Sequence, residues 1–594
     1  MQPEFSRETL SISALLNEPL RRFLNPMEPA LQKLLMLDRL WELVDSARST
    51  ANRSEAVDRL LSLLGITYQI DATELDHVPG SGPVLMVSNH PFGLLEGAIM
   101  ANVLPKLRPD VRILANSLLS GFPELRERCI FIDPFGRSSA MPANAAALRE
   151  CLQWLRGGGL LLAFPAGEVA HLDWRGGTLA DPPWNAPLAR IAQIAGAAAV
   201  PLFFEGGNSI AFQLAGTIHP SLRTASLPRE LLNKRGRTIR IRVGRPVSAA
   251  TLRGFADPQE AIDYLRCRTY LLESIGEPAR LFPQRKPAPV PAPRAADSIA
   301  AEIHRLAPKR KLCELGDLAV FVGNAAELPL TVQEVGRLRE IAYRLAGEGT
   351  GRAVDLDRFD RHYLHLVLWN QSTSEVVGAY RLGPTPDILP HHGIRGLYTS
   401  TLFRYRKELF ERIGPALELG RSFVRPEYQK QYAPLLLLWK GIGGYVASRP
   451  ECATLIGGVS ISNDYTRVSR HLLVKFLEAH RAEELAGLVA PRCPYRPATG
   501  ILRRSPLPTV PRDLDDLSSL IADLESDGKG VPILIKHYLK TGGRLLGFNV
   551  DRRFSNALDA LIMVDLRLAP DALQERLLGK PGAAEFRALH IKRL

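Results

Sequence analysis

Cysteine is scarce in this chain of 594 residues, and no stretch of it stays apolar for long. The six cysteines lie far apart and form no Cys-x-x-Cys pair, which excludes a paired-cysteine zinc site and gives no sign of a disulfide framework. The first residues, MQPEFSRETLSIS, lack the basic and then apolar pattern of a signal peptide. No apolar run reaches the roughly 18 residues that a membrane-spanning helix needs. We therefore expect a cytoplasmic protein, soluble or peripheral to a membrane, without a bound metal.

Acidic residues are fewer than basic ones, 62 against 75, so the formal net charge is +13. Such a surface suits an acidic partner: nucleic acid, an anionic membrane or an acidic carrier protein. No helix-turn-helix, RNP-like or zinc-finger pattern is present, and the arginines are not interleaved with aromatic residues, so we expect no nucleic acid partner. A basic surface that only keeps the protein soluble remains an alternative.

The chain is long enough for more than one domain. Residues 281–298, LFPQRKPAPVPAPRAADS, are rich in proline and alanine without apolar periodicity, which predicts an extended linker. Before it, residues 71–280 alternate apolar runs with helical patterns, which predicts an α/β domain with a mixed sheet flanked by helices. Residues 1–70 read as a helical region in front of that domain. After the linker, residues 299–594 combine helices with strands, including a hairpin over 362–383, and predict an α+β domain.

A histidine and a carboxylate stand close together in SNHPFGLLEG, residues 88–97. His90 follows a predicted buried strand, and Glu96 lies in the first turn of the helix that follows. Open α/β sheets bind ligands at the carboxyl ends of their strands. At such a place His90 could accept a proton from an attacking hydroxyl while Glu96 holds the other ring nitrogen. Taken alone, His90 is better explained as a turn or helix-cap residue.

Three later segments favour the catalytic interpretation: CIFIDPFGR (129–137), FPAGEVA (164–170) and VPLFFEGGNS (200–209). With NHPFGLLEG, and in this order, they resemble the four motifs of the glycerolipid acyltransferase superfamily, in the version of the first motif that hemolysin-like members carry. The resemblance implies transfer of a fatty acyl group from a thioester to a hydroxyl, with His90 as the base and Glu96 beside it. It implies substrate contacts at four further residues: Arg137, Pro165, Gly167 and Glu168.

The third of these segments bears on the acceptor and on the oxyanion. The backbone N–H groups of Gly167 and Glu168 could donate to the oxyanion of the transition state. Members of the superfamily that handle phosphate have FPEGTR, whereas this chain has Ala166 and Val169 in place of the acid and the arginine. A guanidinium grips phosphate with two hydrogen bonds, so its absence argues against a phosphate-bearing acceptor, although Arg137 could supply a cation instead.

A second charged pair lies in ALELGRSFVRPEY, residues 416–428. On a regular strand Glu418 and Arg421 would point to opposite faces, which allows a purely structural interpretation. However, this stretch resembles, with LREIAYR (338–344), DLDRFDRHYL (355–364) and VVGAYRLGPTP (376–386), the acyl-homoserine-lactone synthases and the ornithine N-acyltransferases. Both have a GNAT-like fold and take acyl chains from acyl carrier protein, and the resemblance spans most of residues 315–570. It implies a charged site made of Arg339, Asp357, Asp360, Arg381, Glu418 and Arg421.

Within that implied site, an amine must lose a proton before it attacks a thioester, and Glu418 is the predicted base, directly or through water. The arginines could grip the carboxylate of an amino acid or the phosphopantetheine of the donor. The Gln/Arg-x-x-Gly-x-Gly loop that cradles the pyrophosphate of coenzyme A in many GNAT proteins is not evident. We therefore expect an acyl carrier protein thioester as the donor, whose acidic surface suits a basic enzyme, and no permanently bound cofactor.

Both halves together resemble the fused, bifunctional ornithine lipid synthases. This resemblance implies that the C-terminal domain attaches a 3-hydroxyacyl chain to the α-amine of ornithine and that the N-terminal domain esterifies the hydroxyl of the resulting lyso-ornithine lipid. It also implies work at the inner face of the cytoplasmic membrane. Three alternatives stay open: glycine or glutamine as the head group, a diffusible acyl-homoserine lactone as the product, and a hemolysin-like membrane-binding protein without catalysis.

Overall fold

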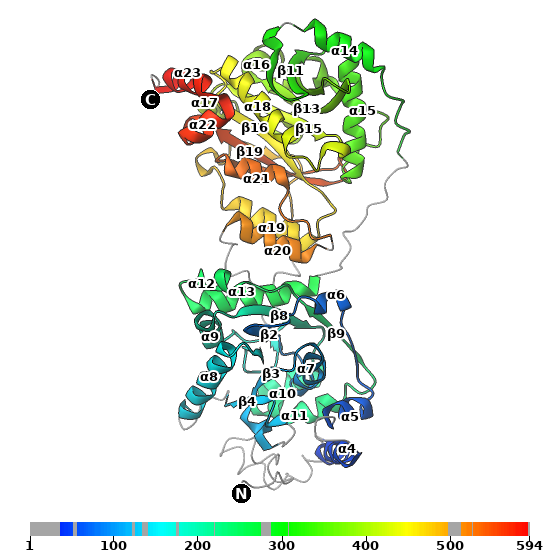
Figure 1. Ribbon diagram of the computed structural model, residues 1–594, viewed down its shortest axis with the longest axis vertical. Helices are drawn as coiled ribbons and strands as arrows, with labels where there is room; N and C mark the ends of the chain where they lie inside the picture. The colour runs from blue at the N-terminus through cyan, green and yellow to red at the C-terminus, as the bar shows by residue number, and fades with distance from the viewer. Residues whose placement is uncertain are drawn as a thin grey trace. The chain divides into compact units, whose positions relative to one another are not determined.

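The computed structural model describes residues 36–50, 56–121, 125–133, 141–173, 178–218, 220–274, 287–306, 308–496, 513–525 and 527–591. The chain folds into two compact units, one within Met1–Ile275 and the other formed by Gly276–Ala498 with Pro511–Leu594 (Figure 1). Each unit is described by itself.

The first unit contains a seven-stranded sheet in the order β1-β9-β8-β2-β5-β3-β4. Its pairs are parallel except for β8 with β9, so the predicted mixed sheet is confirmed. All five residues of the central strand β2 are buried, as expected for a strand covered on both faces. The strands are β1 (Thr67–Gln69), β2 (Val84–Ser88), β3 (Val111–Asn116), β4 (Cys129–Ile132), β5 (Leu160–Ala163), β8 (Ala198–Phe204) and β9 (Thr238–Val243).

Helices cover both faces of this sheet (Figure 1). One face packs against α4 (Leu37–Thr50), α5 (Ala56–Leu63), α7 (Leu94–Leu107) and α11 (Pro220–Leu232). The other packs against α8 (Met141–Arg156), α9 (Pro187–Ala195) and α13 (Pro258–Leu271). Smaller elements are α6 (Ala72–Leu75), α10 (Ile210–Ile218), α12 (Ala249–Arg253) and the hairpin of β6 (His171–Asp173) with β7 (Thr178–Ala180).

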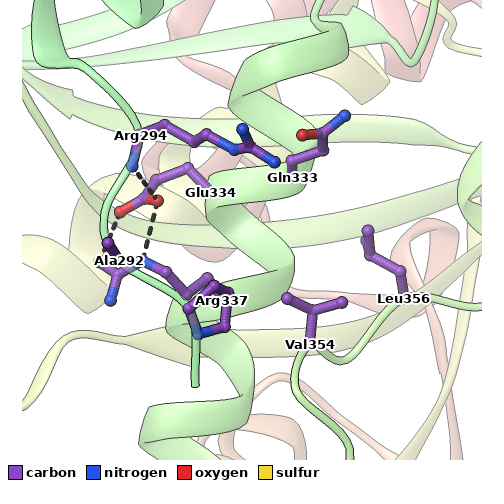
Figure 2. Close-up of a pocket in the computed structure, with 8 residues that line it drawn as sticks. Ala292, Arg294, Gln333, Glu334, Arg337, Val354 and Leu356 are labelled. Atoms are coloured by element: carbon purple, nitrogen blue, oxygen red, sulfur yellow. Dashed lines mark hydrogen bonds and ion pairs between the residues drawn. The ribbon is translucent and has the colours of Figure 1, made fainter. Parts of the chain in front are cut away.

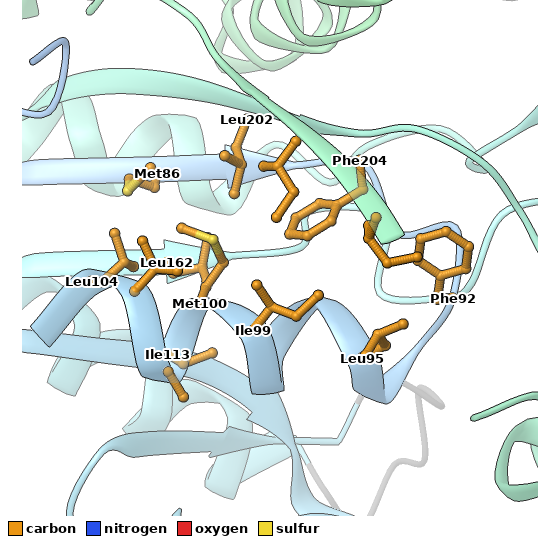
Figure 3. Packing of buried hydrophobic residues seen from close by; sticks show 14 of the residues in the cluster. Met86, Phe92, Leu95, Ile99, Met100, Leu104, Ile113, Leu162, Leu202 and Phe204 are labelled. Atoms are coloured by element: carbon orange, nitrogen blue, oxygen red, sulfur yellow. The ribbon is translucent and has the colours of Figure 1, made fainter. Parts of the chain in front are cut away.

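Figure 3 shows the core between α7 and the sheet. Met86, Leu162 and Leu202 of the strands lie against Ile99 and Met100 of the helix. At the start of α7, buried residues fix the loop that contains His90: Phe92, Leu95 and Phe204. The loop therefore begins from a rigid base, which a site for chemistry needs.

The second unit contains an eight-stranded sheet in the order β10-β11-β12-β13-β15-β16-β19-β18. Only β15 and β16 are parallel, and they pair solely over Ala416–Leu419 with Thr454–Gly457. Beyond that point β15 continues along β13 and β16 along β19, so the two strands diverge. The strands are β10 (Lys311–Leu315), β11 (Leu318–Asn324), β12 (Leu364–Asn370), β13 (Glu375–Pro384), β15 (Ala416–Val424), β16 (Thr454–Ile461), β18 (Arg544–Asp551) and β19 (Ala557–Asp565), with a separate pair of β14 (Phe403–Tyr405) and β17 (Val489–Pro491).

Helices again lie on both faces of the sheet (Figure 1). On one face α14 (Ala296–Arg305) and α15 (Pro329–Leu345) share a core with β12, β13 and β15. On the other, α18 (Ala433–Ser448) packs across β10 to β13 and against α22 (Asp571–Leu578) and α23 (Lys580–Ile591). The remaining helices are α16 (Thr385–His392), α17 (Lys407–Ile413), α19 (Arg467–Glu478), α20 (Leu514–Leu524) and α21 (Ile533–Lys540).

The described part of the predicted linker, residues 287–295, runs along α15 in extended form. The Arg344 guanidinium donates to the Ala288 carbonyl at 2.8 Å. The backbone N–H of Arg294 donates to the Glu334 carboxylate at 3.1 Å (Figure 2). A cavity of about 340 Å³ lies between the linker and α15, and no predicted site residue lines it. The linker ends where α14 begins at Ala296; residues 281–286 lie outside the described residues.

Candidate functional site

His90 lies just beyond the carboxyl end of β2, in a tightly held loop. The backbone N–H of His90 donates to Asp181 Oδ1 at 3.1 Å, and the backbone carbonyl of His90 accepts from the Ala170 N–H at 2.8 Å. The imidazole stacks on Phe164, with ring centroids 4.4 Å apart, and the side chain keeps 16% of its surface exposed. A histidine held this firmly and still reachable can act as a base.

Glu96 is brought to His90 across the six-residue separation by the first turn of α7. Its Oε1 lies 3.4 Å from His90 Nδ1 and accepts hydrogen bonds from the N–H groups of Phe92 and Gly93. The carboxylate is fully buried. Burial by itself lowers the pKa of His90, but the charge and hydrogen bonding of Glu96 and the charge of Asp181 outweigh it and raise the pKa. The pair can therefore stabilise the imidazolium that forms when His90 takes a proton.

Asp181, which the motifs did not indicate, is a second buried carboxylate beside His90. Its Oδ2 accepts from the Trp184 indole at 3.0 Å, and its backbone N–H donates to the Tyr270 hydroxyl at 2.8 Å. Burial raises the pKa of Asp181 to about 6, although the hydrogen bonds from Trp184 and His90 act in the other direction. No local pattern marks Asp181, because its 91-residue separation from His90 is closed only by the fold.

The segment 164–170 follows β5 and turns back toward His90. The Pro165 carbonyl accepts from the N–H and the side-chain amide of Asn185, both at 3.0 Å. The Gly167 N–H donates to the Phe164 carbonyl at 3.0 Å, so it is taken up within the turn. The role of the Gly167 and Glu168 N–H groups toward an oxyanion stays a prediction. Arg137 lies outside the described residues.

A guanidinium does reach this segment, although from another element. Arg223 of α11 lies with Nη2 at 3.6 Å from Glu168 Oε2 and is 15% exposed, whereas Glu168 is 55% exposed. Val169 itself packs at the Gly93 turn. An arginine of α11 therefore lies beside the segment whose own sequence has valine in place of the arginine.

The second predicted site lies on the face of the sheet that α15 covers. Arg339 of α15 contacts Asp355 and Asp360. Arg381 of β13 contacts Asp357 at 2.7 Å and Asp360 at 3.2 Å. Arg421 of β15 lies 3.6 Å from Asp355 and 3.7 Å from Asp357. Burial alone would raise the pKa of Asp360, but the charges of Arg339 and Arg381 hold it at about 2. The arginines and aspartates therefore form one network of balanced charge.

Arg421 reaches this network because β15 is not a regular strand. Arg381 pairs with Gly420 and Ala379 with Phe423, so β15 carries an extra residue, and Arg421 adopts a φ of +52°. A bulge of this kind re-aims a side chain. Glu418 and Arg421 both contact Tyr398, so the expectation of opposite faces from their spacing is wrong.

Glu418 is 1% exposed and firmly held. Its carboxylate accepts from the Tyr363 hydroxyl, from the Thr399 N–H at 2.7 Å and from the Tyr398 N–H at 3.2 Å. Burial raises the pKa of Glu418, against the effect of the hydrogen bonds from Tyr363 and Thr399. A raised pKa suits a base, and the Tyr363 hydroxyl, which donates to Glu418, also accepts from the Tyr398 N–H at 2.8 Å.

The arginines differ in what they can still bind. Arg339 is 1% exposed and its guanidinium is surrounded by Asp355 and Asp360. Arg381 lies over the rings of Tyr363 and Tyr398, at 5.1 and 4.9 Å from their centroids. All three arginines have a buried Nε without a hydrogen-bond partner among the described residues. They differ in exposure: the side chain of Arg421 is 11% exposed, and those of Arg339 and Arg381 are each 1% exposed. Arg421 is therefore the arginine best placed for a ligand.

Sequence reasoning missed two members of this site, Asp355 and Tyr363. Both lie inside the quoted stretch 355–364, so the signal was present, but only the fold shows their contacts with Arg339 and Glu418. No group of three or more histidine, cysteine, aspartate or glutamate residues is arranged to hold a metal ion in the described part of the chain. No helix among the described residues is long and apolar enough to cross a membrane.

Comparison with protein families and known proteins gives matches in both units. A family model described as "Acyltransferase" matches residues 36–277, and one described as "Acetyltransferase (GNAT) domain" matches residues 338–439. A protein named glycine N(alpha)-acyltransferase from Phocaeicola vulgatus is 29% identical over 258 residues, 41% of this chain and 79% of that protein. Its namesake from Bacteroides thetaiotaomicron is 29% identical over 258 residues, 41% of this chain and 76% of its own length.

A protein named lyso-glycine lipid O-acyltransferase from Phocaeicola vulgatus is 26% identical over 215 residues, 34% of this chain and 73% of that protein. A solved structure of a 1-acyl-sn-glycerophosphate acyltransferase from Thermotoga maritima shares 14% identity with a TM-score of 0.23, covering 45% of this chain and 98% of that one. The chain is an acyltransferase with an N-terminal α/β acyltransferase domain and a C-terminal GNAT domain.

Proposed function

We propose that the chain makes a doubly acylated amino acid lipid in two steps. The C-terminal domain joins a 3-hydroxyacyl chain to the α-amine of an amino acid, and the N-terminal domain then acylates the hydroxyl of that chain. The observation that carries the proposal is the presence of two different acyl-transfer domains in one chain, with similarity both to amino acid N-acyltransferases and to a lyso-lipid O-acyltransferase. The product of the first reaction has the hydroxyl that the second needs.

In the N-acylation step the α-amine attacks the thioester carbonyl, a C–N bond forms and the C–S bond breaks. Glu418 accepts the proton of the amine, directly, through water or through Tyr363, and the departing thiolate is finally protonated. Arg421 grips the carboxylate of the amino acid, because it alone of the three arginines keeps an exposed edge. Arg339 and Arg381 hold Asp357 and Asp360 in place.

The donor we propose is a 3-hydroxyacyl group on acyl carrier protein. The ladder between β15 and β16 ends at Leu419 and Gly457, and an extended pantetheine arm would lie where the two strands separate. The carrier's prosthetic group has a single phosphate, which fits the lack of a pyrophosphate loop. Its acidic surface complements the formal charge of +13.

Ornithine is the proposed head group, on the strength of the resemblance along residues 315–570. Glycine is the second candidate, because the named relatives act on glycine according to their names. Ornithine carries a second ammonium group, so a site for ornithine needs a partner for that group. Glycine has no side chain, so a site for glycine needs no such partner.

In the O-acylation step His90 takes the proton of the lyso-lipid hydroxyl as that oxygen attacks a second thioester. Glu96 and Asp181 stabilise the imidazolium, which returns the proton to the leaving thiolate. Arg223, beside Glu168, offers a cation for the carboxylate of the lyso-lipid head group. Because the lyso-lipid is an amphiphile, we place this step at the inner surface of the cytoplasmic membrane.

Expression in a bacterial host without amino acid lipids tests the proposal, with lipids identified by mass spectrometry. We expect the doubly acylated lipid from the wild type, the singly acylated lipid from His90→Ala, and little of either from Glu418→Ala. Full diacylated product from His90→Ala would refute the O-acylation assignment. A diffusible lactone in the medium, or lysis by both variants without new lipid, would refute the proposed function.

A further inference from the structure

Three carboxylates gather beside the arginine network of the second unit, on the face of the sheet that carries Glu418. Asp559 of β19 pairs with Ser460 of β16 and with Asn549 of β18. Asp551 lies two residues beyond Asn549 on β18 and so shares its face. Glu348 follows α15 and accepts a hydrogen bond from the Ser460 hydroxyl at 2.9 Å.

Register places these groups and Glu418 on one face. Glu418 pairs with Ile456, which lies four residues before Ser460 on β16, and residues separated by an even number point to the same side of a strand. Arg421 links the two groups: its guanidinium lies 4.8 Å from the ring centroid of Tyr398 and 4.9 Å from that of Phe554. The Phe554 N–H in turn donates to the Asp551 carbonyl at 3.1 Å. The carboxylates are thus continuous with the proposed N-acylation site.

These acids lack a counter-charge. The three arginines are already matched by Asp355, Asp357 and Asp360. Glu348, Asp551 and Asp559 are 8%, 9% and 7% exposed, and no cation lies within 4 Å of them among the described residues. Asp559 Oδ2 is buried with no hydrogen-bond partner in that part of the chain. A buried carboxylate without a partner is costly, so proteins rarely keep one without a use.

The protonation behaviour of the cluster agrees with this geometry. Burial raises the pKa of Asp559 well above its ordinary range, and the charges of Asp551 and Glu348 raise it further. Burial likewise raises the pKa of Glu348 to about 7. The charge of Arg421 acts in the opposite direction on Asp559 and does not restore an ordinary pKa.

We propose that Asp559, supported by Asp551 and Glu348, is a subsite for the cationic side chain of a diamino acid whose carboxylate is held by Arg421. The proposal rests on the proposed function and narrows its acceptor to an amino acid with a side-chain ammonium, as in ornithine. An ammonium group has three N–H donors and no acceptor. It can therefore donate to carboxylate oxygens that the protein's own donors leave unpaired, such as Asp559 Oδ2. Glycine would leave Asp559 Oδ2 unpaired in the complex.

The test compares acceptors that differ only at the side-chain end. Purified full-length protein is assayed for N-acylation of ornithine, of 2-aminopentanoate, which has the same carbon chain without the ammonium, and of glycine. Each acceptor is tested with a 3-hydroxyacyl thioester of acyl carrier protein and of coenzyme A. We expect the wild type to prefer ornithine to 2-aminopentanoate by about tenfold or more in kcat/KM.

The decisive variant is Asp559→Asn, which keeps the size and hydrogen bonding of the side chain but not its charge. We expect it to lose about tenfold or more of kcat/KM for ornithine, mainly through KM, with 2-aminopentanoate changed little. Asp571→Asn is the matched control, because Asp571 lies in the same unit with a side chain that is 79% exposed. It should leave all three acceptors unchanged.

The failures of the subsite and of the proposed function are distinguishable. Equal loss for ornithine and 2-aminopentanoate in Asp559→Asn would refute the subsite and assign Asp559 a structural role. Wild-type preference for glycine would also refute the subsite, while amino acid N-acylation would stand. Absence of N-acylation of all three acceptors by the wild type would refute the proposed function itself.

Discussion

His90, the proposed base of O-acylation, has its imidazole beside the buried Glu96 carboxylate and its backbone N–H on the buried Asp181 carboxylate, and we expect these charges to set the pH dependence of that step. His90 acts as a base only when it is unprotonated, so the rate rises with pH through its pKa. Because the charge of Glu96 raises that pKa, Glu96→Gln should move the acid limb of the profile about one unit toward lower pH. The measurement is kcat/KM for O-acylation against pH, with the exposed Glu260→Gln as control. An unmoved limb would contradict the role of Glu96.

Glu348 should make the stability of the C-terminal unit depend on pH. Its pKa is raised from 4.5 to about 7, so as pH rises the unfolded chain loses this proton before the folded chain does. The free energy of unfolding should therefore fall between about pH 5 and about pH 8. Glu348→Gln should remove about 1–3 kcal/mol of that fall in denaturant unfolding of the C-terminal unit. Glu483 is exposed, so Glu483→Gln should show the same fall in the free energy of unfolding as the wild type. If Glu348→Gln also showed the full wild-type fall, Glu348 would not hold a buried proton in the folded chain.

At the scale of elements, the loop between β2 and α7 depends on a glycine that no other residue replaces well. Gly93 has a φ of +103°, and a Cβ there would lie 2.8 Å from the Leu227 side chain of α11. Gly93→Ala should cost about 1–3 kcal/mol and displace the turn that holds Glu96, lowering O-acylation but not N-acylation. Gly97, in the first turn of α7, has open space around it, so Gly97→Ala should be neutral or stabilise by up to about 1 kcal/mol. Thermal unfolding and assays of O-acylation and N-acylation by the two variants test this prediction. Equal stability and equal activities of Gly93→Ala and Gly97→Ala would contradict it.

At the scale of the whole molecule, the two proposed reactions would gain from being joined in one chain. An intermediate released by the C-terminal domain meets the N-terminal domain of the same chain at a higher effective concentration than it meets the N-terminal domain of a different chain. Co-expressed His90→Ala and Glu418→Ala proteins should therefore restore the doubly acylated lipid, but at about a tenth of the wild-type amount or less. Lipid mass spectrometry at matched protein levels measures this. A full wild-type yield would show that the intermediate exchanges freely between chains.

Local sequence patterns determined many of the elements and the contact of His90 with Glu96. The apolar run before His90 and the helical pattern after it correspond to β2 and α7, and the stretch 416–424 corresponds to β15. These elements are set by side-chain periodicity and by residues such as Gly93, all of which act over a few positions. The contact of His90 with Glu96 is equally local, since one turn of helix joins them.

The tertiary structure alone decided which distant groups meet. The bulge in β15 depends on its register with β13, so the face of Arg421 could not be read from its spacing to Glu418. Asp181, Arg223 and the cluster at Asp559 come to their sites from segments tens to hundreds of residues away. Residues close together in the chain determine the type of chemistry, whereas burial and the balance of charge, which select the substrate, arise only when strands and helices pack.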